Sequence, residues 1–175
     1  MSVTVDIGEL VSRASFRGRA AFVVSLATSV GAGVLSGESA EAATAALDAC
    51  WNWIEGGDLT AASIHQHIAP LAGLEVRSET STESSALCAV ATAVYYTAWT
   101  SYSAEIAEKR IDPATVPNDM FDVTDQALEE ACQYALETGV LSAGAINSLA
   151  TRVAHASRIV PPEQTGPPIR RRAIQ

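Results

Sequence analysis

The sequence predicts an all-α fold: a single-domain bundle of about six helices with two long central helices rich in alanine and aromatic residues. Apolar residues recur three and four positions apart along most of the chain, which is the period of an amphipathic helix. Only residues 3–7 alternate apolar and polar side chains, and one isolated stretch cannot form a sheet. Hydrophobic residues make up 48% of the 175 residues, enough for one domain with a sizeable core.

The first helix is expected to begin at Asp6, with Glu9 completing a capping pair, and to end at Gly31-Ala32-Gly33. The second helix, residues 39–55, is expected at the centre of the bundle. At 100° per residue, its apolar side chains cover more than half of its circumference, which is wider than the apolar face of a surface helix. Ser36 or Ser39 is expected to cap its start and Gly56-Gly57 its end.

One narrow stripe of this central helix is acidic. Trp51 lies at its border, and a further carboxylate follows the end of the helix. We call this set the acidic strip, and it consists of Glu41, Asp48, Trp51, Glu55 and Asp58. From their helical angles, Trp51 is expected to be partly exposed, whereas Trp53 is expected to be a core residue.

Thr60 is expected to cap a short helix that Pro70 stops, with residues 71–82 forming a polar turn. The long helix that follows spans residues 83–110. It carries an aromatic stripe whose helical spacing favours a place in the core over a ligand-stacking role. The stripe consists of Tyr95, Trp99, Tyr102 and Ile106.

Two prolines make residues 111–121 a loop. A fifth helix is expected to start at Asp122 or Thr124 and to end at Gly139, and Ser142 is expected to cap a sixth. The helical domain then covers residues 1–160. Residues 161–175 contain four prolines and three consecutive arginines without an apolar period, which predicts a disordered tail.

The net charge of −9 argues against nucleic acid as a partner, because phosphate repels such a surface, and favours a basic partner. The three cysteines lie in helical apolar patterns, which is typical of reduced, buried thiols in a cytoplasmic protein. Residues 20–35 follow three arginines as in a signal peptide. They are too short to span a bilayer comfortably, and acidic residues precede them, so neither export nor membrane insertion is predicted.

No catalytic residues, metal site or cofactor are predicted. His65 and His67 are two positions apart, so a regular helix places them on nearly opposite faces. Cys50 has no neighbouring base in the sequence, and the adjacent Glu129 and Glu130 diverge by about 100° on a helix. The chain is therefore not predicted to be an enzyme.

Three segments together resemble one protein family: A-L-D-A-C-W-N-W-I-E-G-G-D-L-T, A-V-Y-Y-T-A-W-T-S-Y and T-V-P-N-D-M-F-D-V-T-D. They are similar to the sixth predicted class of immunity proteins of bacterial polymorphic toxin systems, over roughly residues 10–137. The resemblance implies an all-α cytoplasmic protein that binds and neutralises a cognate toxin. It implies no catalytic residues, and it assigns fold or interface roles to Trp51, Trp53, Glu55 and Trp99.

With this resemblance, the acidic strip is the predicted toxin-binding surface, since carboxylates beside an aromatic ring suit a basic cleft such as that of a nuclease. Three alternatives remain open. A helical adaptor or secretion chaperone would expose an apolar groove, a small enzyme would need convergent polar groups, and a structural subunit would bury its helix faces in an oligomer. The sequence leaves the oligomeric state open.

Overall fold

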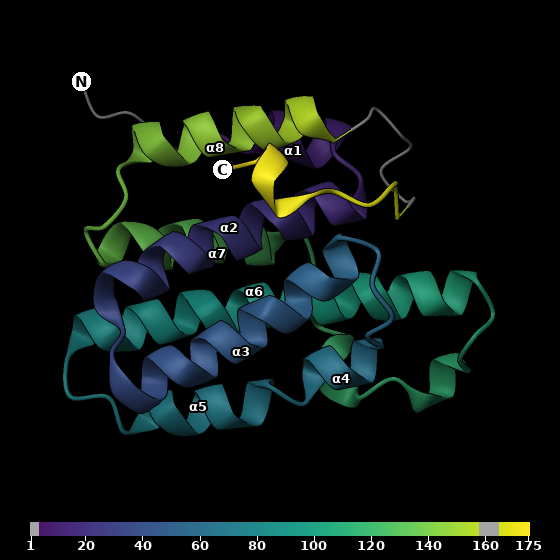
Figure 1. Ribbon diagram of the computed structural model, residues 1–175, viewed down its shortest axis with the longest axis horizontal. Coiled ribbons are helices and arrows are strands. Elements are labelled where there is room, and N and C mark those ends of the chain that lie inside the picture. The colour runs from purple at the N-terminus through teal and green to yellow at the C-terminus, as the bar shows by residue number, and fades with distance from the viewer. Residues whose placement is uncertain (1–3, 158–164) are drawn as a thin grey trace.

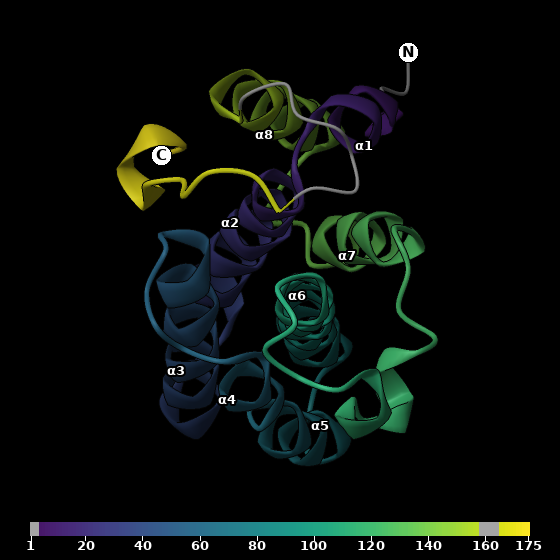
Figure 2. The same cartoon turned by 90° about the vertical axis from the view of Figure 1, so that its right-hand side faces the viewer.

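Helix α6 (Ser81–Ala107) lies at the centre of the fold, with the other long helices around it (Figures 1 and 2). The computed structural model describes residues 4–157 and 165–175, and no strand occurs in these ranges. Thr80 Oγ1 caps α6 by accepting a hydrogen bond from Glu83 N at 3.1 Å. Buried side chains cover most of the circumference of α6, and one face, which includes Tyr95 and Trp99, is half-buried, as expected for a helix at the centre of a bundle. The all-α prediction is confirmed.

The predicted first helix is in fact two helices, α1 (Gly8–Arg13) and α2 (Phe16–Val34). Ala14 is extended, and Ser15 Oγ accepts a hydrogen bond from Gly18 N at 3.1 Å, so Ser15 caps a new helix. Gly31 and Gly33 lie inside α2 and do not end it. The expected role of Asp6 is confirmed in part, because its Oδ1 accepts a hydrogen bond from Gly8 N at the start of α1.

Helix α3 (Gly37–Ile54) forms close to the predicted bounds, with Ser36 as its N-cap residue, but it packs on α2 and α6 at the side of the bundle and is not its central helix (Figure 2). Thr60 caps α4 (Ala61–His65) as expected. The prediction that Pro70 stops a helix is wrong, because Pro70 is the third residue of α5 (Ile68–Val76). The first turn of a helix leaves its N–H groups unpaired, so a proline there breaks no hydrogen bond.

The C-terminal half follows the predicted order. The predicted loop contains two short 3₁₀ turns, η1 (Pro113–Thr115) and η2 (Asn118–Met120). Helices α7 (Gln126–Glu137) and α8 (Ala143–Ala156) follow, and Ser142 caps α8. Helix α7 packs against α6 and α2, whereas α8 and α1 lie on the far side of α2 from α6 (Figure 2). No helix in the described ranges is both long and apolar enough to cross a membrane.

Residues 165–175, which we call the C-terminal segment, pack against the helices, so the predicted disorder is wrong for them. Ile169 and Ile174 are buried, and Ile169 N donates a hydrogen bond to Ile54 O at the end of α3. Gly56, at φ +86°, allows the close approach, since a Cβ there would lie 2.8 Å from the ring of Pro168. The predicted domain boundary at residues 160–161 lies outside the described residues.

Candidate functional site

Part of the acidic strip is in contact with the C-terminal segment of the same chain. Arg171, in the short turn η3 (Arg171–Ala173), places Nη2 2.8 Å from Asp48 Oδ1 and donates its backbone N–H to Glu55 Oε1 at 2.8 Å. Its guanidinium lies 5.1 Å from the ring centre of Trp51, a cation–π distance. Asp48 and Glu55 are therefore brought together, but by an arginine of the same chain.

Trp51 is only 2% exposed, so the prediction of a partly exposed ring is wrong. The reason is the C-terminal segment, whose packing on α3 the helical angle of Trp51 could not reveal. Trp53 is buried as expected, and the guanidinium of Arg17 lies 5.1 Å from its ring centre. Glu41, Asp48 and Asp58 are exposed, and Glu55 is half-buried.

A second set of acidic and aromatic side chains is open to solvent. Phe121 follows η2 and is 67% exposed, one of the few large apolar side chains with that exposure among the described residues. A hollow of about 260 Å³ lies in this region between α6 and the start of α7. We call the following residues the Phe121 surface: Tyr95, Asp119, Phe121, Asp122 and Glu130.

Two contacts position Asp119 in this surface. His65 of α4 places Nε2 3.0 Å from Asp119 Oδ2, and the hydroxyl of Tyr95 lies 3.5 Å from the same oxygen. Burial and the Asp119 carboxylate raise the pKa of Tyr95 above its ordinary value, so this hydroxyl stays a hydrogen-bond donor at neutral pH. The 3₁₀ turn η2 is therefore joined to α4 and α6 by polar contacts.

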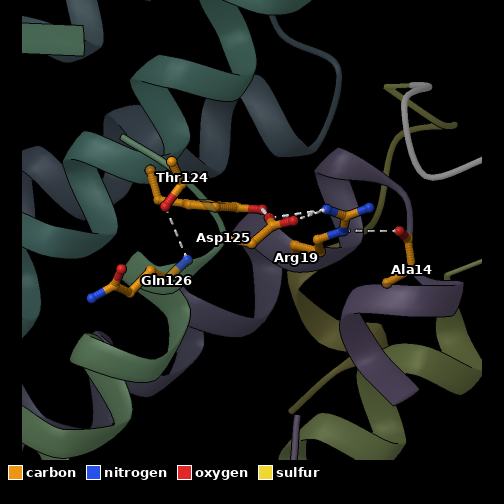
Figure 3. Close-up of polar contacts among 6 residues, drawn as sticks. Ala14, Arg19, Thr124, Asp125 and Gln126 are labelled. Atoms are coloured by element: carbon orange, nitrogen blue, oxygen red, sulfur yellow. Dashed lines mark hydrogen bonds and ion pairs between the residues drawn. The ribbon is translucent and has the colours of Figure 1, made fainter. Parts of the chain in front are cut away.

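A largely buried ion pair fixes the other end of this loop. Arg19 of α2 is 2% exposed and places Nη1 2.8 and 2.9 Å from the two carboxylate oxygens of Asp125 (Figure 3). Arg19 also donates Nε–H to Ala14 O, and the hydroxyl of Tyr96 donates to Asp125 Oδ1 at 2.7 Å. Because Asp125 directly precedes α7, these bonds hold the start of α7 against α2 and α6.

The candidate catalytic and metal-binding side chains are not arranged for chemistry. Burial raises the pKa of the Cys50 and Cys132 thiols to about 12, so neither is a ready nucleophile at neutral pH. In the described ranges no group of three His, Cys, Asp or Glu side chains is placed to hold a metal ion.

A comparison with known protein families identifies the family of the chain. A sequence model of immunity protein Imm6 matches residues 18–137, well over half of the chain. The chain belongs to the Imm6 immunity protein family. Neither a curated protein nor a solved structure matches it. The resemblance seen in the sequence is thus confirmed.

The Imm6 match spans all but the first two residues of α2, the helices from α3 to α6, and α7. Both candidate surfaces therefore lie within the family region, whereas α1, α8 and the C-terminal segment lie outside it. Sequence reasoning missed Phe121 as a surface residue. Its signal was present, because an aromatic side chain between two aspartates in a proline-containing loop belongs to no helical apolar face.

Proposed function

We propose that this Imm6 protein binds and neutralises a cognate bacterial toxin by direct protein–protein contact, and that the Phe121 surface makes the contact. Membership of the family supports the general function. The 67% exposure of Phe121, on a loop held in place at both ends, supports the choice of surface. Exposed aromatic side chains on rigid supports are typical centres of protein interfaces.

The charges around Phe121 indicate what kind of toxin surface fits. Asp119, Asp122 and Glu130 line the hollow next to the loop that carries Phe121, and the chain as a whole carries a net charge of −9. Such a surface attracts a basic partner and accelerates its encounter. A toxin that cleaves nucleic acid presents a basic cleft to phosphate, so carboxylates bound in that cleft would exclude the substrate. We therefore propose a basic toxin site, such as that of a nuclease, as the target.

The acidic strip remains the alternative contact surface. Its carboxylates Glu41 and Asp58 are exposed and unobstructed. The Asp48 carboxylate is also exposed but is paired with Arg171, and the buried ring of Trp51 would become available only after Arg171 had moved. The Phe121 surface needs no such rearrangement, and this difference favours it.

The alternative of an adaptor or secretion chaperone rests on an apolar docking groove. An open groove of about 960 Å³ lies between α1 and α7 and is lined by both apolar and polar residues, among them Val11, Leu136, Gln126 and Glu129. The strongly exposed apolar side chains of the described residues, such as Phe121 and Val76, lie outside this groove. An adaptor would also leave the toxin active after binding, which the following experiment measures.

The test is co-expression with the toxin encoded by the neighbouring gene, together with a binding titration. Phe121→Ala should lose protection and weaken binding by about 30-fold, as expected for an interface centre, while the melting temperature stays near that of the wild type. Val76→Ala is the matched control, because Val76 is 82% exposed at the end of α5. It should keep full protection.

Full protection by Phe121→Ala would remove this surface from the interface. The variant Asp48→Lys with Glu55→Lys examines the alternative. Loss of protection in that variant, with binding unchanged in Phe121→Ala, would assign the contact to the acidic strip.

A further inference from the structure

The Phe121 surface is too small to hold a protein partner by itself. A stable protein complex buries roughly 800 Å² on each partner and involves about 20–30 residues a side. The few residues of the Phe121 surface supply only part of such an area, so a stable contact must also use the surface beside it.

The open groove between α1 and α7, of about 960 Å³, adjoins the Phe121 surface. Its lining from the α7 side runs over residues 125–136, nearly the whole of that helix. At about 1.5 Å per residue, this length is roughly 16 Å, or about three turns of a helix. Gln126 lines both the groove and the hollow beside Phe121, so the two depressions meet at the start of α7.

Both walls of the groove are held in place. On one wall, Asn147 of α8 binds the backbone before α1: its Oδ1 accepts a hydrogen bond from Asp6 N, and its Nδ2 donates one to Thr4 O, each at 2.9 Å. On the other wall, the ion pair between Arg19 and Asp125 fixes the start of α7. The groove is therefore preorganised, which reduces the entropy lost when a partner binds.

The lining of the groove combines apolar and acidic side chains. Val5, Val11 and Leu136 are half-buried, so a partner can cover what remains exposed of them. Asp6 and Glu129 are exposed, and Glu129 makes no ion pair or hydrogen bond with another described residue. None of the described residues that line the groove is a lysine or arginine. The groove thus offers apolar contacts together with negative charge.

We infer that this groove binds a basic amphipathic helix of the toxin. The inference rests on the proposed function and names the part of the toxin that extends the contact beyond Phe121. The apolar face of the helix packs against Val11 and Leu136, and its lysine or arginine side chains face Asp6 and Glu129.

The walls of the groove favour a helix over an extended segment. An extended segment needs a strand edge to pair its backbone N–H and C=O groups, whereas a helix pairs these groups internally. The groove offers no such edge, because α1 and α7 are helices and Asn147 already binds the backbone before α1. Its length also matches about three helical turns.

The first test is photo-crosslinking of the full chain to the toxin domain encoded by the neighbouring gene. The photoreactive amino acid p-benzoylphenylalanine replaces Gln133, an exposed residue that lines the groove. Mass spectrometry should find it joined to a toxin segment that is rich in lysine and arginine and has apolar residues three and four positions apart. The same amino acid at the exposed Val76 is the negative control, and at Phe121 it tests the proposed surface in the same complex.

The second test is a binding titration with a charge reversal in the groove. Glu129→Lys should weaken toxin binding by about tenfold and leave the melting temperature near that of the wild type, because Glu129 is exposed and unpaired. Glu79→Lys is the matched control, since it changes the net charge equally at an exposed position before α6, outside the groove. It should bind like the wild type.

The outcomes separate this inference from the proposed function. A crosslink from Phe121 without one from Gln133, or equal affinities of the Glu129→Lys and Glu79→Lys variants, would overturn the inference and leave the proposed function intact. A crosslink from Gln133 to an acidic segment or to one without a helical period would overturn it as well. A basic helical segment crosslinked from Gln133 alone would support the groove and remove the Phe121 surface. No crosslink from either position would overturn both.

Discussion

At the scale of single residues, the contact between Arg19 and Asp125 has the clearest energetic consequence. Arg19 is nearly inaccessible to water, and a buried charge is tolerated when it is paired and hydrogen-bonded. Asp125 supplies both oxygens to Arg19 and accepts the hydroxyl of Tyr96 as well. One carboxylate therefore stabilises a charge on α2 and a phenol on α6.

Asp125→Ala should lower the free energy of unfolding by about 2–3 kcal/mol, because it removes the carboxylate from a buried guanidinium. The half-exposed position of Asp125 keeps the loss below that of a fully buried pair. Tyr96→Phe, which removes only one hydrogen bond, should cost about 1 kcal/mol. Urea denaturation measures both values, and a smaller loss for Asp125→Ala than for Tyr96→Phe would contradict this ranking.

The tryptophans differ in burial, and therefore in the stability that each should contribute. Trp53 is buried, as the sequence predicted, whereas Trp99 is only half-buried, beside Phe16 and Tyr96. Trp53→Ala should therefore cost about 3–5 kcal/mol, and Trp99→Ala clearly less. Thermal and urea unfolding of the two variants would measure both losses of stability. Equal losses would mean that Trp99 is as fully enclosed as Trp53.

At the scale of elements, the C-terminal segment is the main departure from the sequence prediction. Its two buried isoleucines are five positions apart among prolines and arginines, so no helical or strand period marks them. The wrong prediction that Pro70 stops a helix has a similar cause. A proline in the first turn of a helix and a proline after the end of a helix look alike in the sequence. By contrast, the caps at Thr60 and Ser142 were predictable, because capping depends on local residues.

Deletion of residues 165–175 should lower the melting temperature by several degrees. Each buried isoleucine contributes roughly 1.5–3 kcal/mol, and 1 kcal/mol corresponds to about 2–4 °C at this chain length. Arg171→Ala should lower it less, and Arg172→Ala, an exposed neighbour, should leave it unchanged. An unaltered melting temperature after the deletion would show that the segment adds no stability.

At the scale of the whole molecule, the buried thiols should make the folded protein less stable at alkaline pH. Burial raises the pKa of Cys50 and Cys132 from the ordinary 9.0 to about 12 and also raises that of Tyr96. The unfolded chain therefore loses these protons first, so stability should fall as the pH rises from about 9 towards 12. Urea denaturation across this range measures the slope. Cys50→Ala should flatten it, and an identical slope would contradict the assignment.

The net charge of −9 has its own consequence for the proposed toxin contact. Added salt should slow association and leave dissociation nearly unchanged, because screening weakens long-range attraction more than close contacts. Stopped-flow mixing with the toxin domain at low and high salt measures both rates. An association rate that salt leaves unchanged would argue against a basic toxin surface.

The candidate site was less predictable than the fold. Helical periodicity identifies which residues of α3 share a stripe, and Asp48 and Glu55 do lie together. It cannot show that a segment more than 110 residues later covers that stripe, because tertiary packing decides such contacts. Phe121 lies in a loop without a period, so its exposure became visible only once η2 and α7 were placed.

The different surroundings of the three tryptophans make the fluorescence of this protein a local probe of its structure. Each indole has a different neighbour: Arg171 beside Trp51, Arg17 beside Trp53, and Tyr96 beside Trp99. Indole fluorescence responds to nearby charge, so three variants that each keep one tryptophan would give three local emission signals. Trp51 would report detachment of the C-terminal segment, Trp53 movement at the start of α2, and Trp99 changes on α6. The chain thus carries intrinsic probes that would resolve which part of it responds first to heat, denaturant or a partner.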